Sequence, residues 1–310
     1  MRLARGPAAF LLGGLLLGGC ASGQATSLTG RLVRPGQPAV DLGGAPMADD
    51  SEQLRQLSAE GAPRTSTFGA TIESTDPRLA AALLLEAGAP TAENHIRVAD
   101  EYQRLGVLDS AFRRLLLAVK KKPRMAEAHA AIARAWRNWG MPERGLSAAY
   151  RAVFFGADLA DIQNTLGTVL DALGELDGAR DAYQRALAIN PTAAWALNNL
   201  CYLEFRLGRL AEARTLCEGS LRQAPDFAAA RNNLALIFAA SGDLSRARAE
   251  LLRSGDQATG HYNVGMLFFA RGDYAAAAQA FEEAIRVRPS FAAAKTRAHA
   301  ARLRLLTGGN

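Results

Sequence analysis

Residues 194–208 read AWALNNLCYLEFRLG, and residues 228–242 read AAARNNLALIFAASG. The two stretches lie 34 residues apart, share the tripeptide Asn-Asn-Leu and end at a glycine. Apolar residues recur in both at the three- and four-residue spacing of a helix that has one buried face. A helix that returns at a fixed interval is typical of a repeat array, because each unit buries its apolar face against the next.

The same interval extends along most of the chain. Glycines follow one another 34 residues apart and then once after 30, at Gly106, Gly140, Gly174, Gly208, Gly242 and Gly272. Prolines keep the same step at Pro123, Pro191, Pro225 and Pro289. Glycine is favoured just after a helix and proline cannot continue one, so the unit is predicted to be helix, turn, helix, turn. Six units are predicted, beginning at Ala92, Ala126, Ala160, Ala194, Ala228 and Ala258.

The third unit carries Leu166-Gly167, Ala179, Tyr183 and Pro191 at the spacing of a known repeat signature. This pattern resembles the tetratricopeptide repeat. The resemblance implies an all-α, right-handed α-solenoid of six helix hairpins over residues 76–310, with small residues at positions eight and twenty packing against each other. PRLAAALLLEAG before the first repeat and a helix over 292–306 after the last are predicted to cap it. The fifth repeat is four residues short, so its second helix is expected to be cut by about one turn.

The first residues differ in character from the array. Residues 1–19 have two arginines and a short apolar run, as in a signal peptide, and end just before Cys20. Small residues followed by this cysteine resemble a bacterial lipobox, which implies that Cys20 is lipidated and that the protein is anchored in the cell envelope, in the outer membrane facing the periplasm. The alternative is an ordinary export signal with a chance cysteine. Residues 20–75 are predicted to be a disordered tether of about 40 Å.

The other two cysteines and the histidines are assigned to packing. Cys201 and Cys217 fall at positions eight and twenty-four of one repeat. Since position eight is expected to face position twenty, we favour two buried thiols over a disulfide, which needs close Cα atoms. His95, His129 and His261 share position four of different repeats, so no metal site is expected. No phosphate loop or catalytic triad is found, so neither cofactor nor catalysis is predicted. The formal charge of +6 does not call for nucleic acid.

The resemblance also implies which residues line the concave wall. Amides recur at positions five and six of the first helices, at Asn164, Asn198, Asn199, Asn232, Asn233 and Asn263. Aromatic residues accompany them at Tyr202, Phe205, Tyr262 and Phe269, and basic ones in the second repeat at Arg134 and Arg137. Each amide offers donors and an acceptor, so a column of them can hold the backbone of a peptide. The alternative is that these amides only bond the neighbouring helix.

The predicted function is a non-catalytic scaffold anchored in the envelope, binding an extended or helical segment of another protein. Its architecture resembles the lipoproteins of tight-adherence (Flp) pili and the pilotins of type IV pili, which implies a role in assembling a pilus or secretion complex. Two alternatives remain open. The array could deliver substrates to a separate envelope enzyme, or it could be a cytoplasmic adaptor if residues 1–19 are not a signal.

Overall fold

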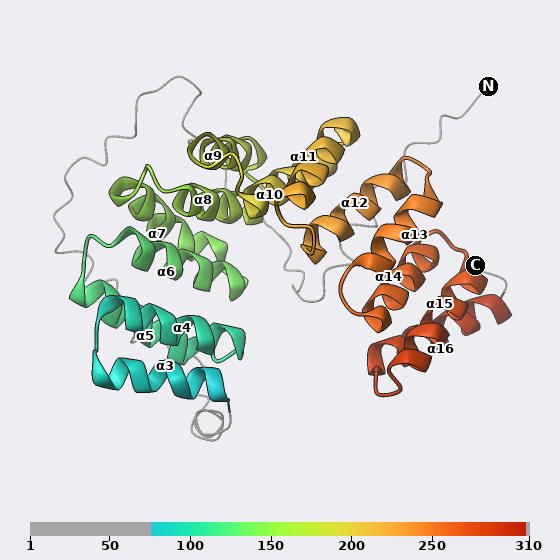
Figure 1. Cartoon of the computed structure of the whole chain (residues 1–310), viewed down its shortest axis with the longest axis horizontal. Helices are drawn as coiled ribbons and strands as arrows, with labels where there is room; N and C mark the ends of the chain where they lie inside the picture. Colours follow the sequence, from blue (N-terminus) through green and yellow to red (C-terminus); the bar gives the residue numbers. More distant parts are fainter. Residues whose placement is uncertain (1–75, 308–310) are drawn as a thin grey trace. The chain divides into compact units, whose positions relative to one another are not determined.

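The computed structural model describes residues 76–307, and within that range all regular structure is α-helical (Figure 1). Fourteen helices occupy these residues and no strand does, which confirms the predicted all-α class for the described part of the chain. The chain divides after Gly156 into two compact units, residues 76–156 and residues 157–307. The predicted signal peptide, Cys20 and the tether lie outside the described residues. No helix of residues 76–307 has the length and apolar character needed to cross a bilayer.

The unit of residues 76–156 holds one single helix and two hairpins. Its helices are α3 (Pro77–Gly88), α4 (Ala92–Arg104), α5 (Leu108–Lys121), α6 (Ala126–Asn138) and α7 (Pro142–Phe155). The first of them begins at an Asp76 cap, whose Oδ1 accepts the backbone N–H of Leu79 at 2.9 Å. Buried Glu86 joins α3 to the next hairpin, since one oxygen lies 2.5 Å from His95 Nδ1 and the other 3.0 Å from Arg114 Nη1. This helix therefore covers the end of the first hairpin, as a cap must.

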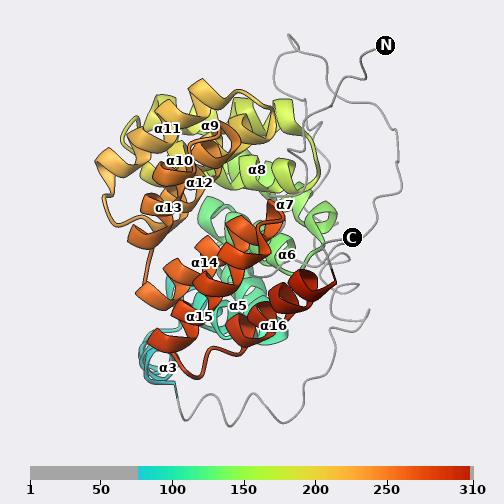
Figure 2. The same ribbon diagram turned by 90° about the vertical axis from the view of Figure 1, so that its right-hand side faces the viewer.

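The unit of residues 157–307 holds four hairpins and a final helix. Its helices are α8 (Ala160–Ala172), α9 (Leu176–Ile189), α10 (Ala194–Arg206), α11 (Leu210–Gln223), α12 (Ala228–Ala240), α13 (Leu244–Arg253), α14 (Gln257–Ala270), α15 (Tyr274–Val287) and α16 (Ala292–Leu306). The first helices of the hairpins (α8, α10, α12 and α14) follow one another, and the second helices (α9, α11, α13 and α15) lie beside them (Figures 1 and 2). The predicted stacked hairpins are thus observed within this unit.

Glycine closes the turn inside each hairpin, and its conformation explains the 34-residue spacing. Gly208, after α10, has φ of 77°, and the equivalent glycines of the other hairpins lie between 75° and 86°. This left-handed region is costly for any residue that has a Cβ. The repeating glycine is therefore a backbone requirement of the turn.

The short fifth repeat loses the end of its second helix, as expected. α13 stops at Arg253 after 10 residues, whereas α11 has 14. Gly255 then turns the chain with φ of 78°. Asp256 caps α14 by accepting the backbone N–H of Thr259 at 3.1 Å. As a result α14 begins at Gln257, one residue before the predicted start of the sixth repeat.

Inside the hairpins, position eight packs against position twenty-four, 16 residues later. A Cβ on Gly167 would lie 2.5 Å from the ring of Tyr183, and one on Gly265 would lie 2.6 Å from the ring of Phe281. The pairing of positions eight and twenty implied by the resemblance is therefore incomplete, because the aromatic side chain fills the space that the glycine leaves.

This register corrects the prediction for the cysteines. Cys201 and Cys217 form a disulfide that joins α10 to α11, with their Cα atoms 5.4 Å apart. They occupy the same two positions as the glycine and aromatic pairs, at the same separation of 16 residues. The pairing of positions eight and twenty also occurs, since a Cβ on Gly145 would lie 2.9 Å from the carbonyl oxygen of Ala133. The prediction of two free thiols was wrong because position eight faces position twenty-four as well as position twenty.

Candidate functional site

Six asparagines on the first helices of residues 157–307 form what we call the amide relay: Asn164, Asn198, Asn199, Asn232, Asn233 and Asn263. Its bonds run from position six of one repeat to position five of the repeat before. Asn199 Nδ2 donates to Asn164 Oδ1, and Asn233 Nδ2 donates to Asn198 Oδ1, each at 2.9 Å. Asn198 Nδ2 donates to Asn199 Oδ1 at 3.4 Å and so connects these two bonds. The relay therefore ties α8, α10 and α12 together.

The short repeat weakens the next bond of the relay. Asn263 Nδ2 reaches Asn232 Oδ1 at 3.5 Å, the limit of a hydrogen bond. The same oxygen accepts a 2.6 Å bond from Ser254 Oγ, at the end of α13. Ser220 is the equivalent residue of the repeat before, and it donates to the carbonyl of Ala194 at 2.7 Å. Ser254 Oγ lies 3.3 Å from the corresponding carbonyl of Ala228, so its bond to Asn232 is the additional contact. The lost turn of α13 thus coincides with a change in the hydrogen bonding of the relay.

These bonds bear on how the amides were interpreted from the sequence. Asn198, Asn233 and Asn263 are buried, with 7%, 8% and 6% of their surface exposed. A buried amide needs a partner, and here the neighbouring helix supplies it. The arrangement favours the alternative in which the amides hold adjacent repeats together. The signal that sequence reasoning missed is the 35-residue spacing between position five and the next position six.

Four half-buried aromatic residues, which we call the aromatic row, lie on the same first helices: Tyr202, Phe205, Tyr262 and Phe269. Phe205 packs on the core around the disulfide, and both Tyr262 and Phe269 pack on the core between α14 and α16. Each ring is neither fully buried nor fully exposed. Such side chains can pack against an apolar surface of a partner while they keep their contacts with the core.

Tyr202 is fixed in place by its neighbours. Its ring stacks on Phe205 with centroids 6.4 Å apart, and the guanidinium of Arg206 lies 5.8 Å from its centroid. Arg206 in turn forms an ion pair with Asp171 on α8. Burial of the ring raises the pKa of the Tyr202 hydroxyl, so the group stays neutral. Tyr202 therefore presents a pre-ordered aromatic surface.

Tyr262 and Phe269 are held in the same way on α14. Tyr262 lies between Phe281 and Phe291, with centroid distances of 5.6 and 5.1 Å. Phe269 meets Tyr274 edge to face at 5.2 Å. Neighbouring side chains thus hold all four rings in place. Binding of a partner would therefore cost little additional side-chain conformational entropy.

The two predicted basic residues belong to the other unit. Arg134 and Arg137 are half-buried on α6, within residues 76–156. Arg137 Nη2 donates to Asn138 Oδ1 at 2.8 Å, and Asn138 Nδ2 reaches Gln103 Oε1 at 3.5 Å. The structure therefore places the amides and the aromatic residues on first helices of residues 157–307, but the arginines on the other unit.

The three histidines at position four of their repeats occupy packing positions. His129 Nε2 lies 2.7 Å from the carbonyl of Pro123, and its ring stacks on Phe155 at 5.5 Å. His95 is bound to Glu86 as described above, and His261 is half-buried on α14. Among residues 76–307, no group of three or more His, Cys, Asp or Glu side chains is arranged to hold a metal ion.

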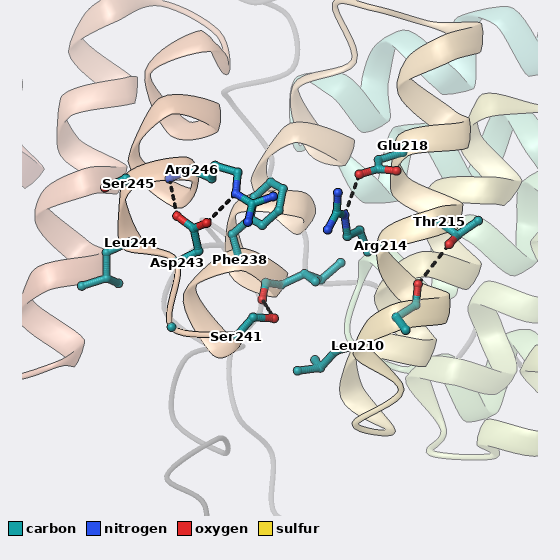
Figure 3. A pocket seen from close by; sticks show the side chains of 13 residues that line it. Leu210, Arg214, Thr215, Glu218, Phe238, Ser241, Asp243, Leu244, Ser245 and Arg246 are labelled. Carbon is teal, nitrogen blue, oxygen red and sulfur yellow. Dashed lines mark hydrogen bonds and ion pairs between the residues drawn. The ribbon is translucent and has the colours of Figure 1, made fainter.

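A pocket that the sequence did not indicate lies between α11 and α13, with a volume of about 1030 Å³ (Figure 3). Phe238 lies between two guanidinium groups, with Arg214 at 5.4 Å and Arg246 at 4.7 Å from its centroid. Each cation already has an acid, because Arg214 Nε donates to Glu218 at 2.7 Å and Arg246 pairs with Asp243. The backbone N–H of Arg246, followed by its side chain, lowers the pKa of Asp243. The pocket is therefore balanced in charge.

Comparison with known proteins agrees with this architecture. The tetratricopeptide repeat family matches residues 170–226 and 205–263 in one profile and residues 258–291 in another. The predicted tetratricopeptide repeats are thus confirmed over residues 170–291. A search of curated protein sequences found no match.

Three solved structures share the fold at low sequence identity. The APC/C hetero-tetramer Cut9-Hcn1 is 18% identical with a TM-score of 0.60, over 75% of this chain and 48% of that one. The chain thus spans about half the length of that protein. PilF of Pseudomonas aeruginosa is 19% identical (TM-score 0.53, 69% of this chain, 97% of that one). PilW, a type IV pilus biogenesis factor, is 20% identical (TM-score 0.56, 66% and 97%). At these identities the likeness concerns the fold alone.

Proposed function

Because residues 170–291 carry tetratricopeptide repeats, we propose that the protein is a non-catalytic scaffold that binds a segment of another protein on the aromatic row. The observation that carries this proposal is the contrast between the two sets of residues on the first helices. Three of the six amides are buried and the relay is bonded to itself, whereas every ring of the aromatic row keeps part of its surface exposed. Binding energy at protein interfaces concentrates on such aromatic anchors.

The partner segment should therefore carry apolar side chains. The bonds between Asn199 and Asn164 and between Asn233 and Asn198 already use part of the donor and acceptor capacity with which these amides could bind a peptide backbone. Each such bond contributes about 1 kcal/mol, and leaving its groups unpaired costs more. The aromatic rings, in contrast, keep their ring contacts and still leave part of their surface exposed. Arg134 and Arg137 belong to the other unit, so the proposed surface is restricted to α10 and α14.

The finer proposal places this scaffold in the bacterial cell envelope, where it assists assembly of a pilus or secretion complex. The disulfide between Cys201 and Cys217 supports an oxidising compartment. The apolar run before Cys20 supports export, and a lipid on Cys20 would hold the protein at the membrane. The likeness to PilW, a type IV pilus biogenesis factor, supports the choice of complex. The disulfide speaks against the alternative of a cytoplasmic adaptor.

The test is recovery of partners from cells that make the full-length protein. Cross-linking and affinity purification should recover an envelope protein with the wild type, and Tyr202→Ala/Tyr262→Ala should lose it. The matched control is Tyr150→Ala/Phe154→Ala, which removes two aromatic rings that are 42% and 68% exposed on α7. Equal recovery with both variants would refute binding on the aromatic row. Labelled palmitate incorporated by the wild type but not by Cys20→Ser tests the anchor separately.

A further inference from the structure

Helix α16 presents an exposed face that carries basic residues along most of its length and leucines at its C-terminal end. Its sequence AAAKTRAHAARLRLL contains four lysine and arginine residues and no acid. Lys295, His299, Arg302, Leu303 and Leu306 lie at i, i+4, i+7, i+8 and i+11, which places them on one side of the helix. All five are exposed, with Leu303 at 47% and Leu306 at 84%. Leu303, Leu305 and Leu306 are exposed together at the end of this helix, and neighbouring exposed apolar side chains mark candidate interaction sites.

The opposite side of α16 is used for packing. Ala294, Ala298 and Ala301 are buried, and the last two belong to the core that α16 shares with α14 and α15. Figures 1 and 2 both place α16 beside α15, at the end of the helix series of residues 157–307. The helix is therefore fixed by its small residues, and its mixed face points away from the core.

We infer that this face of α16 lies on the surface of an anionic lipid bilayer. A helix with cations and leucines on one exposed face matches the headgroup region, where the apolar groups enter the acyl boundary and the cations meet the phosphates. The acyl chains take up Leu303 and Leu306, and Lys295 extends its amine to the headgroups. Glu282 on α15 partly offsets the positive charge, since Arg302 Nη2 donates to it at 2.6 Å. α16 itself contains four basic residues and no acid, so its own net charge is positive.

The bilayer is a better fit than an acidic protein for a structural reason. The basic residues of this face extend along the helix from Lys295 to Arg302, and the two leucines follow them at its C-terminal end. A fluid headgroup layer accommodates such a spacing without a matching partner. The inference does not depend on the proposed binding at the aromatic row, and either can fail alone.

The test measures hydrogen exchange of α16 in the full-length protein mixed with vesicles. One vesicle is phosphatidylcholine alone, and the other contains one third phosphatidylglycerol. Amides of residues 292–306 should exchange more slowly with the anionic vesicles only, and high salt should remove the difference. Lys295→Gln/Arg302→Gln should lower the affinity of this contact about 30-fold. Leu303→Ser/Leu306→Ser should also abolish the protection.

Matched controls separate the face of α16 from general charge and apolarity. Lys121→Gln/Arg124→Gln removes two exposed cations near the end of α5, and Leu84→Ser/Leu85→Ser removes two leucines of α3 that are 75% and 51% exposed. Both should keep wild-type protection of α16. The inference is overturned if exchange is equal in the two vesicles, or if the controls match the α16 variants. Protection by an acidic protein in the absence of lipid would equally overturn it.

Discussion

Packing between positions eight and twenty-four predicts that a single methyl group at Gly167 destabilises the array. The added Cβ would lie 2.5 Å from Tyr183, whose ring is 2% exposed and cannot move aside freely. Overpacking of this kind costs about 1–3 kcal/mol. Alanine also favours helix over glycine by about 1 kcal/mol. The net expectation for Gly167→Ala is a loss of about 1 kcal/mol in the free energy of unfolding.

Shortening the aromatic side chain should reverse the sign of this effect. The fifth repeat already pairs Ala235 with Leu251, both buried. In a Tyr183→Leu background the overlap is gone, so Gly167→Ala should stabilise the protein by about 1 kcal/mol. The double-mutant cycle then gives a coupling of about 2 kcal/mol between the two positions.

Urea unfolding followed by far-ultraviolet circular dichroism measures all four members of the cycle. Gly178→Ala is the control, since its Cβ would meet only the flexible end of Leu170 at 3.3 Å, and it should stabilise slightly. If Gly167→Ala changes stability equally with Tyr183 and with Leu at that position, the packing argument is refuted.

Three further predictions follow from the described contacts. Reducing the bond between Cys201 and Cys217, which closes a loop over 16 residues, should lower the free energy of unfolding by about 3 kcal/mol, and Cys201→Ser/Cys217→Ser should abolish the effect of reductant. Glu204 is fully buried and accepts from Arg180 Nε at 2.7 Å, so Glu204→Ala should cost about 3 kcal/mol in urea unfolding, while unchanged stability would contradict a structural role for this pair. Hydrogen bonding by the Thr259 side chain lowers the pKa of Asp256 from 3.8 to about 2. The stability that ionised Asp256 contributes should therefore be fully present above pH 4 and decline as the pH falls towards 2. Measured as the free energy of unfolding against pH, this decline should be smaller in Asp256→Asn than in the wild type.

The contribution of Asp256 to the free energy of unfolding should be small. Its side chain is 53% exposed, so solvent screens its interaction with Arg288. The cap itself, in which Asp256 accepts the N–H of Thr259, is the larger contribution. High salt should therefore leave most of the acid-dependent change in place.

Much of the architecture follows from local chemistry and is therefore readable in the sequence. Gly208 and its equivalents mark the turns because only glycine adopts the left-handed backbone there without strain. The helices between them begin at Ala126, Ala160, Ala194 and Ala228, in step with the repeat interval. The shortened α13 also follows directly from four missing residues.

The pairings between side chains were decided by the tertiary structure. Whether Cys217 meets Cys201 depends on how far one helix slides along the other, and the spacing of residues within each helix does not determine that offset. The same holds for Asn199 and Asn164, whose bond requires that position six of one helix lie level with position five of the helix before. Turns and helix lengths are thus set by each residue's own backbone preferences, whereas contacts between helices are set by the packing of whole surfaces.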